Sequence, residues 1–306
     1  MERIENTLYA KRYPLYAKKE LLMYEKFYGF KENPFRMTPD SKFFYPSPKH
    51  TEALSSLLYT IQQRKGFVVI TGEIGAGKTT VCQTLLRKLD LNTKVARVFN
   101  THLTNRELLI AILDDLEIPY KPGTKGKLIG QLYDFLITQA FSGVNVVILI
   151  DEAQNLSPTV LEEVRMLSNL ETEKEKLIQI VLVGQPQLKE KLKMPKLEQL
   201  RQRVVLHYHI APLTVQETKD YVRHRLAVAG GDSEIFEEEA LDRVYAFSKG
   251  VPRLTNLICD SALLSGFLYE RKTISREIMD EVIREAPLQG SSAEDPSFVE
   301  KIAHSV

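Results

Sequence analysis

Residues 67–79 read FVVITGEIGAGKT, a short apolar run that passes directly into a glycine-rich loop. The run is rich in β-branched residues and predicts a buried strand over Phe67–Thr71. The loop Gly72–Thr79 fits the pattern G-x-x-x-x-G-K-[ST], and a helix is predicted to follow it through Leu89. A strand, a loop of this pattern and a helix in succession predict a phosphate-binding loop.

In such a loop the glycines let main-chain N–H groups turn toward phosphate oxygens, and the positive end of the next helix faces the same anion. We expect Lys78 to reach the β- and γ-phosphates of a nucleotide and Thr79 to bind Mg²⁺. A chance glycine-rich turn is the alternative; the bare pattern arises in roughly 1% of chains this long. The residues expected to hold the nucleotide are Gly72, Glu73, Ile74, Gly75, Ala76, Gly77, Lys78, Thr79 and Thr80.

A second motif joins a buried strand to two acids. The aliphatic run Val146–Ile150 predicts a strand and is followed at once by Asp151 and Glu152. Because open α/β sheets bind ligands at the carboxyl ends of their strands, both carboxylates are expected beside the loop. We expect Asp151 to hold Mg²⁺ and Glu152 to act as general base on the attacking water. The alternative is an ordinary strand that ends before a helix, where acids are also favoured.

The acidic pair also separates the classes of protein that carry such a loop. The chain lacks the N-K-x-D motif with which small GTPases read guanine. Simple nucleotide kinases do not need a carboxylate poised on water. A glutamate beside the magnesium aspartate therefore favours hydrolysis and the ATPase class.

Two amide side chains follow other predicted strands. Gln185 comes after the run Leu177–Val183 and is expected to emerge beside Asp151 and Glu152, aimed at the γ-phosphate or the water. Asn100 ends the second strand and could hold Glu152 away from water until a partner arrives. The alternative for both amides is a polar turn residue.

Three arginines are candidates for contact with the phosphates. In Leu200–Val204 we expect Arg203 first, and Arg201 second, to enter the site of a neighbouring subunit, where such a residue raises the rate by ~10³–10⁵. Solvated charges at a helix end are the alternative. Arg253 opens a helix after Gly250-Val251-Pro252, where a cation opposes the helix dipole, so we expect it to swing over bound phosphates.

The order of elements predicts an α/β domain followed by an all-helical one. Strands separated by helices imply parallel crossovers, with one sheet covered on both faces. Strands are predicted over 67–71, 94–98, 146–150, 177–183 and 204–209, with helices over 50–63, 105–116, 125–141 and 157–171 between them. Helices alone are predicted over 214–229, 236–248, 253–269 and 275–285. The domains expected are an arm of uncertain order (1–22), an extended aromatic and proline-rich segment packed on the core (23–49), the α/β core (50–211), a helical lid (212–287) and a flexible tail (288–306).

Composition excludes several classes of protein. The net charge is +1, from 41 Lys and Arg against 40 Asp and Glu, and gives no support to nucleic-acid binding. Two cysteines far apart exclude a disulfide scaffold and a cysteine zinc site. No apolar run reaches the ~18 residues of a membrane span, and the first residues lack a signal-peptide core. We expect a cytoplasmic protein, or one held at the inner face of the membrane by a partner.

With these motifs in order, the chain resembles the AAA+ ATPases, and most closely their ExeA/GspA-type branch, whose members serve secretion or surface-polymer systems. The resemblance implies a five-stranded parallel sheet and a helical lid with Mg²⁺ and ATP between them, in a homo-oligomeric ring or filament. It also implies that Gln185 is sensor 1, Arg203 the arginine finger and Arg253 sensor 2. Members often continue into a membrane span and a peptidoglycan-binding region, which these 306 residues do not contain. The motifs that carry the resemblance, within residues 23–285, are YGF (28–30), NPF (33–35), GEIGAGKTT, LIDEAQNL, LVGQPQL, LRQRV and GVPRLTNLICD.

Three functions remain open at this point. The first is an ATP-hydrolysing motor or switch that drives an unidentified protein partner of a secretion, envelope or polymer-export machine. The second is a transposition regulator that assembles on DNA, suggested by the basic residues of 187–203. The third is a non-hydrolysing ATP sensor, which the Asp151-Glu152 pair argues against. The basic residues in question are Lys189, Lys191, Lys193, Lys196, Arg201 and Arg203, against Glu190 and Glu198.

Overall fold

The computed structural model describes residues 24–99, 101–173 and 175–286. The described residues divide into two compact units, an α/β unit over Pro46–Ala211 and a helical unit made of residues 24–45 and 212–286. The chain passes from the α/β unit to the helical unit between Ala211 and Pro212. The predicted arm 1–22 and tail 288–306 lie outside the described residues.

The α/β unit is built on a parallel sheet, as predicted. Within the described residues the sheet has five strands in the order β2-β3-β4-β1-β5, all paired in parallel. Each strand begins and ends within two residues of its predicted limits. The strands are β1 (Phe67–Gly72), β2 (Thr93–Val98), β3 (Asn145–Ile150), β4 (Gln179–Gly184) and β5 (Val204–Ile210).

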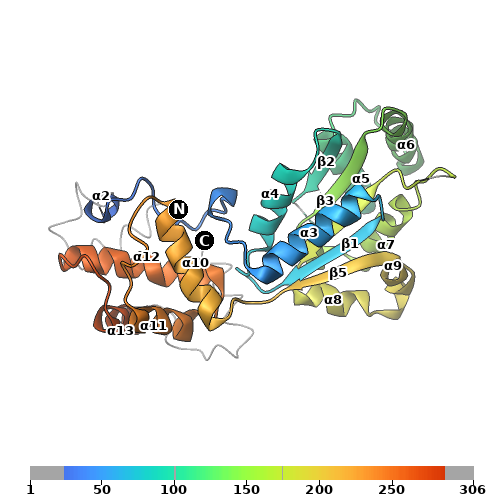
Figure 1. Cartoon of the computed structure of the whole chain (residues 1–306). Helices are drawn as coiled ribbons and strands as arrows, with labels where there is room; N and C mark the ends of the chain where they lie inside the picture. The colour runs from blue at the N-terminus through green and yellow to red at the C-terminus, as the bar shows by residue number, and fades with distance from the viewer. Residues whose placement is uncertain (1–23, 100, 174, 287–306) are drawn as a thin grey trace. The chain divides into compact units, whose positions relative to one another are not determined.

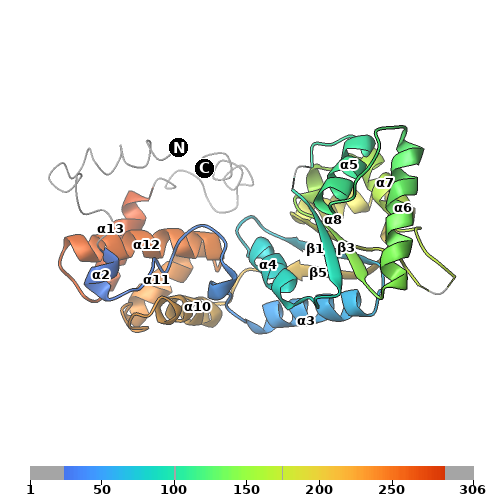
Figure 2. The same cartoon turned by 90° about the horizontal axis from the view of Figure 1, so that it is seen from above.

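The three central strands are apolar throughout because helices cover both faces of the sheet. Every residue of β1, β3 and β4 is buried. Figure 2 shows α3 and α4 on one side of the sheet and α5, α7 and α8 on the other. The covering helices are α3 (Pro48–Gln62), α4 (Lys78–Lys88), α5 (Asn105–Asp115), α6 (Lys125–Phe141), α7 (Pro158–Leu167), α8 (Pro186–Leu192) and α9 (Glu198–Arg203).

Two features of this unit differ from the sequence prediction. Helix α7 ends at Leu167, four residues early, because the Ser168 hydroxyl donates to the carbonyl of Arg165 and Leu177 N donates to the carbonyl of Leu170. These contacts turn the chain back toward β4. The short helices α8 and α9 were not predicted, and they form where Leu188, Leu192 and Leu200 join the core beneath the sheet.

The helical unit contains α10 (Val215–Val228), α11 (Glu238–Ser248), α12 (Pro252–Leu268) and α13 (Arg276–Glu285), close to their predicted limits (Figure 1). A capping box begins α10, with Thr214 and Glu217 each accepting from the other's main-chain N–H. Gly250, with φ +78, sits so close to Leu213 that a Cβ would lie 1.9 Å from its carbonyl oxygen. Only glycine therefore fits this turn before α12.

Residues 24–45 belong to the helical unit, which corrects the prediction that 23–49 packs on the α/β core. The segment holds the short helix α2 (Tyr24–Tyr28), and its Phe35 and Phe43 lie inside the hydrophobic core of the helical unit. Arg225 of α10 fixes the segment by donating to the carbonyl oxygens of Pro34 and Arg36. The aromatic residues indicate burial, but their partners are residues far along the chain that the local sequence does not identify.

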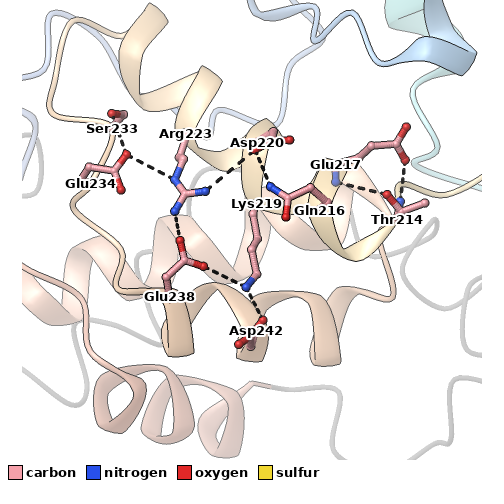
Figure 3. Close-up of polar contacts among 10 residues, drawn as sticks. All are labelled: Thr214, Gln216, Glu217, Lys219, Asp220, Arg223, Ser233, Glu234, Glu238 and Asp242. Atoms are coloured by element: carbon pink, nitrogen blue, oxygen red, sulfur yellow. Dashed lines mark hydrogen bonds and ion pairs between the residues drawn. The ribbon is translucent and has the colours of Figure 1, made fainter.

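A network of charges ties α10 to α11 and to the turn before α11 (Figure 3). Lys219 pairs with Glu238 and Asp242, and Arg223 pairs with Asp220, Glu234 and Glu238. The acids are largely exposed, so water screens these pairs and each adds little to stability. Among helices of the described residues, none combines the length and apolar character that a bilayer-spanning segment needs.

Candidate functional site

The candidate site lies at the carboxyl ends of β1, β4 and β3, which are neighbours in the sheet. The register pairs Thr71 of β1 with Gly184 of β4, and Leu182 of β4 with Ile150 of β3. The loop after β1, the amide after β4 and the acids after β3 therefore leave the sheet at the same level. This is the edge where open α/β sheets bind ligands.

The glycine-rich loop ends at Gly77, the residue that caps α4. Gly77 has φ +95, a conformation that favours glycine, and no side chain caps the first turn of α4. Main-chain N–H groups at a helix start lack partners within the helix, so the start of α4 can accept an anion. The loop thus has the geometry of a phosphate-binding loop.

Lys78 is the buried cation of the site, with a side chain 6% exposed. Its Nζ donates to the carbonyl oxygens of Gly72 and Glu73, at 2.8 and 3.0 Å. Burial lowers the pKa of Lys78, while the carboxylates of Glu152, Asp151 and Glu73 oppose this shift. The ammonium group is therefore held by loop carbonyls close to the acids after β3.

Asp151 is the buried acid, at 8% exposure. Burial raises the pKa of its carboxyl group, while the hydrogen bond from Glu152 N to Asp151 Oδ1, at 2.9 Å, opposes the shift. Its own N–H donates to the carbonyl of Val98 on β2, at 3.0 Å. The acid is thus fixed to the sheet, and a bound cation would relieve the cost of its burial.

Glu152 has a backbone conformation that is rare outside glycine, with φ 50 and ψ 36. Its Oε2 accepts from the side-chain amide of Gln154 and, at 3.3 Å, from Nε2 of Gln185. Gln185 therefore lies beside the acidic pair, as predicted. Strained backbone that positions a side chain is common at functional sites.

The sequence reasoning missed Gln154 and Lys191. Gln154 contacts both Glu152 and, through Oε1, the main-chain N–H of Gln185 at 3.0 Å. Lys191 of α8 donates to the carbonyls of Gln154 and Leu156. Gln154 is two residues after Glu152 in the sequence. An amide this close to a candidate base could have indicated its contact with the Glu152 carboxylate. Nothing in the sequence marked Lys191 apart from the basic residues around it.

Of the three candidate arginines, the two in the α/β unit do not lie at this edge of the sheet. Arg203 ends α9 just before β5, and its Nη1 donates to Ser168 at 3.3 Å. Arg201 pairs with Glu198 at 3.8 Å. Arg253 lies in the first turn of α12, in the helical unit. Asn100 lies outside the described residues, and its role stays a prediction.

The residues present fit a nucleotide and a hard cation. The uncapped start of α4 and the buried Lys78 suit phosphate oxygens, and the buried Asp151 carboxylate and the Thr79 hydroxyl are oxygen ligands of the kind that Mg²⁺ prefers. Among the described residues there is no group of three or more His, Cys, Asp or Glu that could hold a metal by itself. A magnesium ion would therefore take its other ligands from the nucleotide and water.

Comparison with known proteins agrees with this geometry. Residues 61–192 match the family model described as AAA domain. The chain is 47% identical over 246 residues to the general secretion pathway protein A of Aeromonas hydrophila. The match covers 80% of this chain and 45% of that protein, so the chain spans less than half of its relative's length. The predicted resemblance to the ExeA/GspA-type AAA+ ATPases is confirmed.

Solved structures with the same fold are more distant in sequence. The Cdc6p protein of Pyrobaculum aerophilum has a TM-score of 0.63 at 19% identity, covering 87% of this chain and 74% of that one. The RuvB branch migration motor of Thermotoga maritima has a TM-score of 0.55 at 18% identity, covering 78% and 69%. These likenesses establish the AAA+ fold, with its parallel α/β sheet and helical region, as predicted.

Proposed function

Starting from a chain that has the AAA+ fold and resembles a general secretion pathway protein, we propose that it binds Mg-ATP and hydrolyses the bond between the β- and γ-phosphates, releasing ADP and phosphate. The convergence of Lys78, Asp151 and Glu152 at one edge of the sheet carries this proposal. A cation for the phosphates, an acid for the metal and a second acid for the water are the three groups that ATP hydrolysis requires.

Each residue has a distinct role in this proposal. The N–H groups at the start of α4 and the Lys78 ammonium bind the β- and γ-phosphates, and Lys78 leaves the loop carbonyls to do so. Thr79 and Asp151 would hold Mg²⁺, which neutralises charge on the phosphates when bound. Glu152 accepts a proton from the attacking water, and the Gln185 amide beside it orients the γ-phosphate or the water.

We further propose that the site is completed at a subunit boundary. Arg203 precedes Val204, which pairs with Phe67 at the start of β1, whereas the phosphate-binding loop follows the other end of β1. One strand of this length is about 20 Å, so Arg203 is too far to reach the loop of its own chain. The position supports a role in the site of a neighbouring copy. Arg253 would act from the helical unit as a sensor of the γ-phosphate.

The partner machine is proposed to be a secretion or envelope system, because the relative at 47% identity is named for the general secretion pathway. The transposition alternative is not favoured by the structure of the basic stretch. Lys193 pairs with Glu190, Arg201 with Glu198, and Lys191 donates to two carbonyls within the unit. Lys191 is thus held within the unit, and the exposed Lys193 and Arg201 each have an acid beside them that offsets their charge.

The test is ATP hydrolysis as a function of protein concentration, with Mg²⁺ present. We expect turnover per chain to rise with concentration and to fall at least 100-fold in Glu152→Gln, which retains ATP but lacks the base. Mixing Arg203→Ala with Lys78→Ala should restore part of the activity, since each supplies what the other lacks. A turnover per chain that does not change with concentration, with Arg203→Ala fully active, would refute the subunit boundary. Absence of turnover in the concentrated wild type would refute hydrolysis.

A further inference from the structure

Gln154 joins two of the strand ends that form the site. It lies in the 3-10 turn η2 (Ala153–Asn155) after β3, and its side chain is 9% exposed. The Nε2 group donates to Oε2 of Glu152, and Oε1 accepts from Gln185 N at 3.0 Å. One planar amide therefore bridges the carboxylate after β3 and the main chain after β4.

Glu152 depends on these contacts for its orientation. Its Oε2 receives both the Gln154 amide and, at 3.3 Å, the amide of Gln185. A carboxylate that accepts two N–H groups on one oxygen is held in one rotamer, and the other oxygen keeps a fixed direction. A general base works only within hydrogen-bond reach of the water, and a displacement of about 1 Å can cost roughly 100-fold in rate.

Gln154 is itself fixed from two further sides. A Cβ at Gly184 would lie 2.8 Å from Gln154 Oε1, so the glycine at this position is what allows the amide to approach β4. From α8, Lys191 donates to the carbonyl oxygens of Gln154 and Leu156. Burial lowers the pKa of Lys191, as expected for an ammonium group directed into the protein. The amide is thus held in place before it contacts Glu152.

We propose that Gln154 is a positioning residue of the ATPase site, which aligns the Glu152 carboxylate with the amide of Gln185 so that base and sensor act together. This inference rests on the proposed ATP hydrolysis. Gln154 touches neither the nucleotide nor the water in this role, and acts through Glu152 and Gln185. Its loss should therefore reduce the rate of the chemical step and leave ATP binding intact.

The experiment compares Gln154→Ala and Gln154→Glu with wild type in the full chain, under single-turnover conditions. The alanine variant loses both hydrogen bonds, and the single-turnover rate constant is expected to fall about 10- to 100-fold, the value of one hydrogen bond to a charged group. Gln154→Glu keeps the shape and the acceptor for Gln185 N but replaces the donor to Glu152 by a negative charge, so the loss should be larger. The dissociation constant for ATP should change less than about twofold in both, since binding is separate from this contact.

A double-mutant cycle separates positioning from a purely structural role. In a Glu152→Gln background, Gln154→Ala is expected to cost less than about twofold further, because the group it aligns is already lost. Gln187→Ala, an exposed glutamine on α8, is the matched control and should keep wild-type kcat. Thermal unfolding of each variant identifies any that fail to fold, and the near-isosteric glutamate variant then carries the test.

Two results would overturn the proposal while leaving ATP hydrolysis standing. One is a wild-type kcat in Gln154→Glu with Glu152→Gln inactive. The other is an equal loss from Gln154→Ala in both backgrounds. Failure of the proposed function looks different, since then the wild type shows no turnover and Glu152→Gln changes nothing.

Discussion

Lys78 in the α/β unit and Arg225 in the helical unit are both 6% exposed, yet the two buried cations have opposite surroundings. Lys78 donates to two carbonyls of its own loop and lies near carboxylates that it does not pair with directly. Arg225 donates to carbonyls of a segment about 190 residues away and to the Tyr221 hydroxyl, and it stacks over the Phe43 ring at 4.7 Å.

The difference indicates that the buried charge of Lys78 serves the candidate site, whereas the buried charge of Arg225 stabilises the fold. The Arg225 contacts are complete without any ligand, since its planar guanidinium matches several fixed acceptors. The Lys78 contacts can be exchanged for phosphate oxygens, because a flexible ammonium group turns easily toward a stronger acceptor. We therefore expect changes at Lys78 to alter activity and changes at Arg225 to alter stability.

The largest effect is expected for Lys78→Ala. Loss of the ammonium group should lower kcat/KM for ATP by about 10³-fold, as the loss of a preorganised charge at a reacting group does. The ligand-free protein should unfold at the wild-type temperature or above it, because burial of the charge is unfavourable and lowers the pKa of Lys78. Turnover assays and thermal unfolding without nucleotide test both parts. A large drop in melting temperature would mean that Lys78, like Arg225, stabilises the fold.

Arg225→Met should act on stability instead. Removing the guanidinium leaves the carbonyl of Pro34 and the hydroxyl of Tyr221 without their donor in a buried place, at a cost of about 3 kcal/mol in the free energy of unfolding. Denaturant titration measures this value. ATP affinity of the folded fraction should stay within about twofold of wild type. A stability equal to wild type would contradict the anchoring role.

The effect of pH on stability tests whether a buried charge of the site, the Asp151 carboxylate, costs stability when no ligand is bound. Burial raises the pKa of its carboxyl group, so the folded state binds this proton more tightly than the unfolded chain does. The group therefore costs stability at neutral pH, and the cost disappears as pH falls through the folded pKa. Asp151→Asn should stabilise the ligand-free protein at pH 7, and the gain should shrink toward pH 4. Denaturation in the presence of a chelator at both pH values measures this, and a gain that grows in acid would contradict it.

The smallest effect is expected in the charge network of the helical unit. Lys219→Met removes the pairs with Glu238 and Asp242, but these acids are exposed at 61% and 57%. Solvent and salt screen such pairs, so we expect a change in melting temperature of less than about 2 °C. The change should vanish in about 1 M salt. A large shift would mean that the network, rather than Arg225, organises this unit.

The sequence was sufficient for the parts of the fold that have local patterns. The β-branched runs of the strands and the glycine-rich loop predict their structure from local sequence alone. The limits of each strand were predicted to within two residues. Helices α8 and α9 have too few residues for a period, and they depend on burial of Leu188 and Leu200 under the sheet. Short segments of this kind are decided by tertiary contacts.

The same distinction applies to the candidate site. Lys78, Asp151 and Gln185 were recognised because they follow strands or lie in a motif of fixed spacing. Gln154 lies within the LIDEAQNL motif, but its role comes from a hydrogen bond to residue 185, after a strand that no local rule pairs with β3. The unit to which residues 24–45 attach was also beyond local reasoning, because its contacts are with residues about 190 or more positions away.

Because residues 24–45 belong to the helical unit, that unit is discontinuous in the sequence. The polypeptide passes from one unit to the other twice, at Tyr45–Pro46 and again at Ala211–Pro212. Phe35 and Phe43 therefore reach the helical core from the far side of the whole α/β sequence. A fragment cut to residues 212–286 would lack these two rings and would leave the apolar side chains around them open to water.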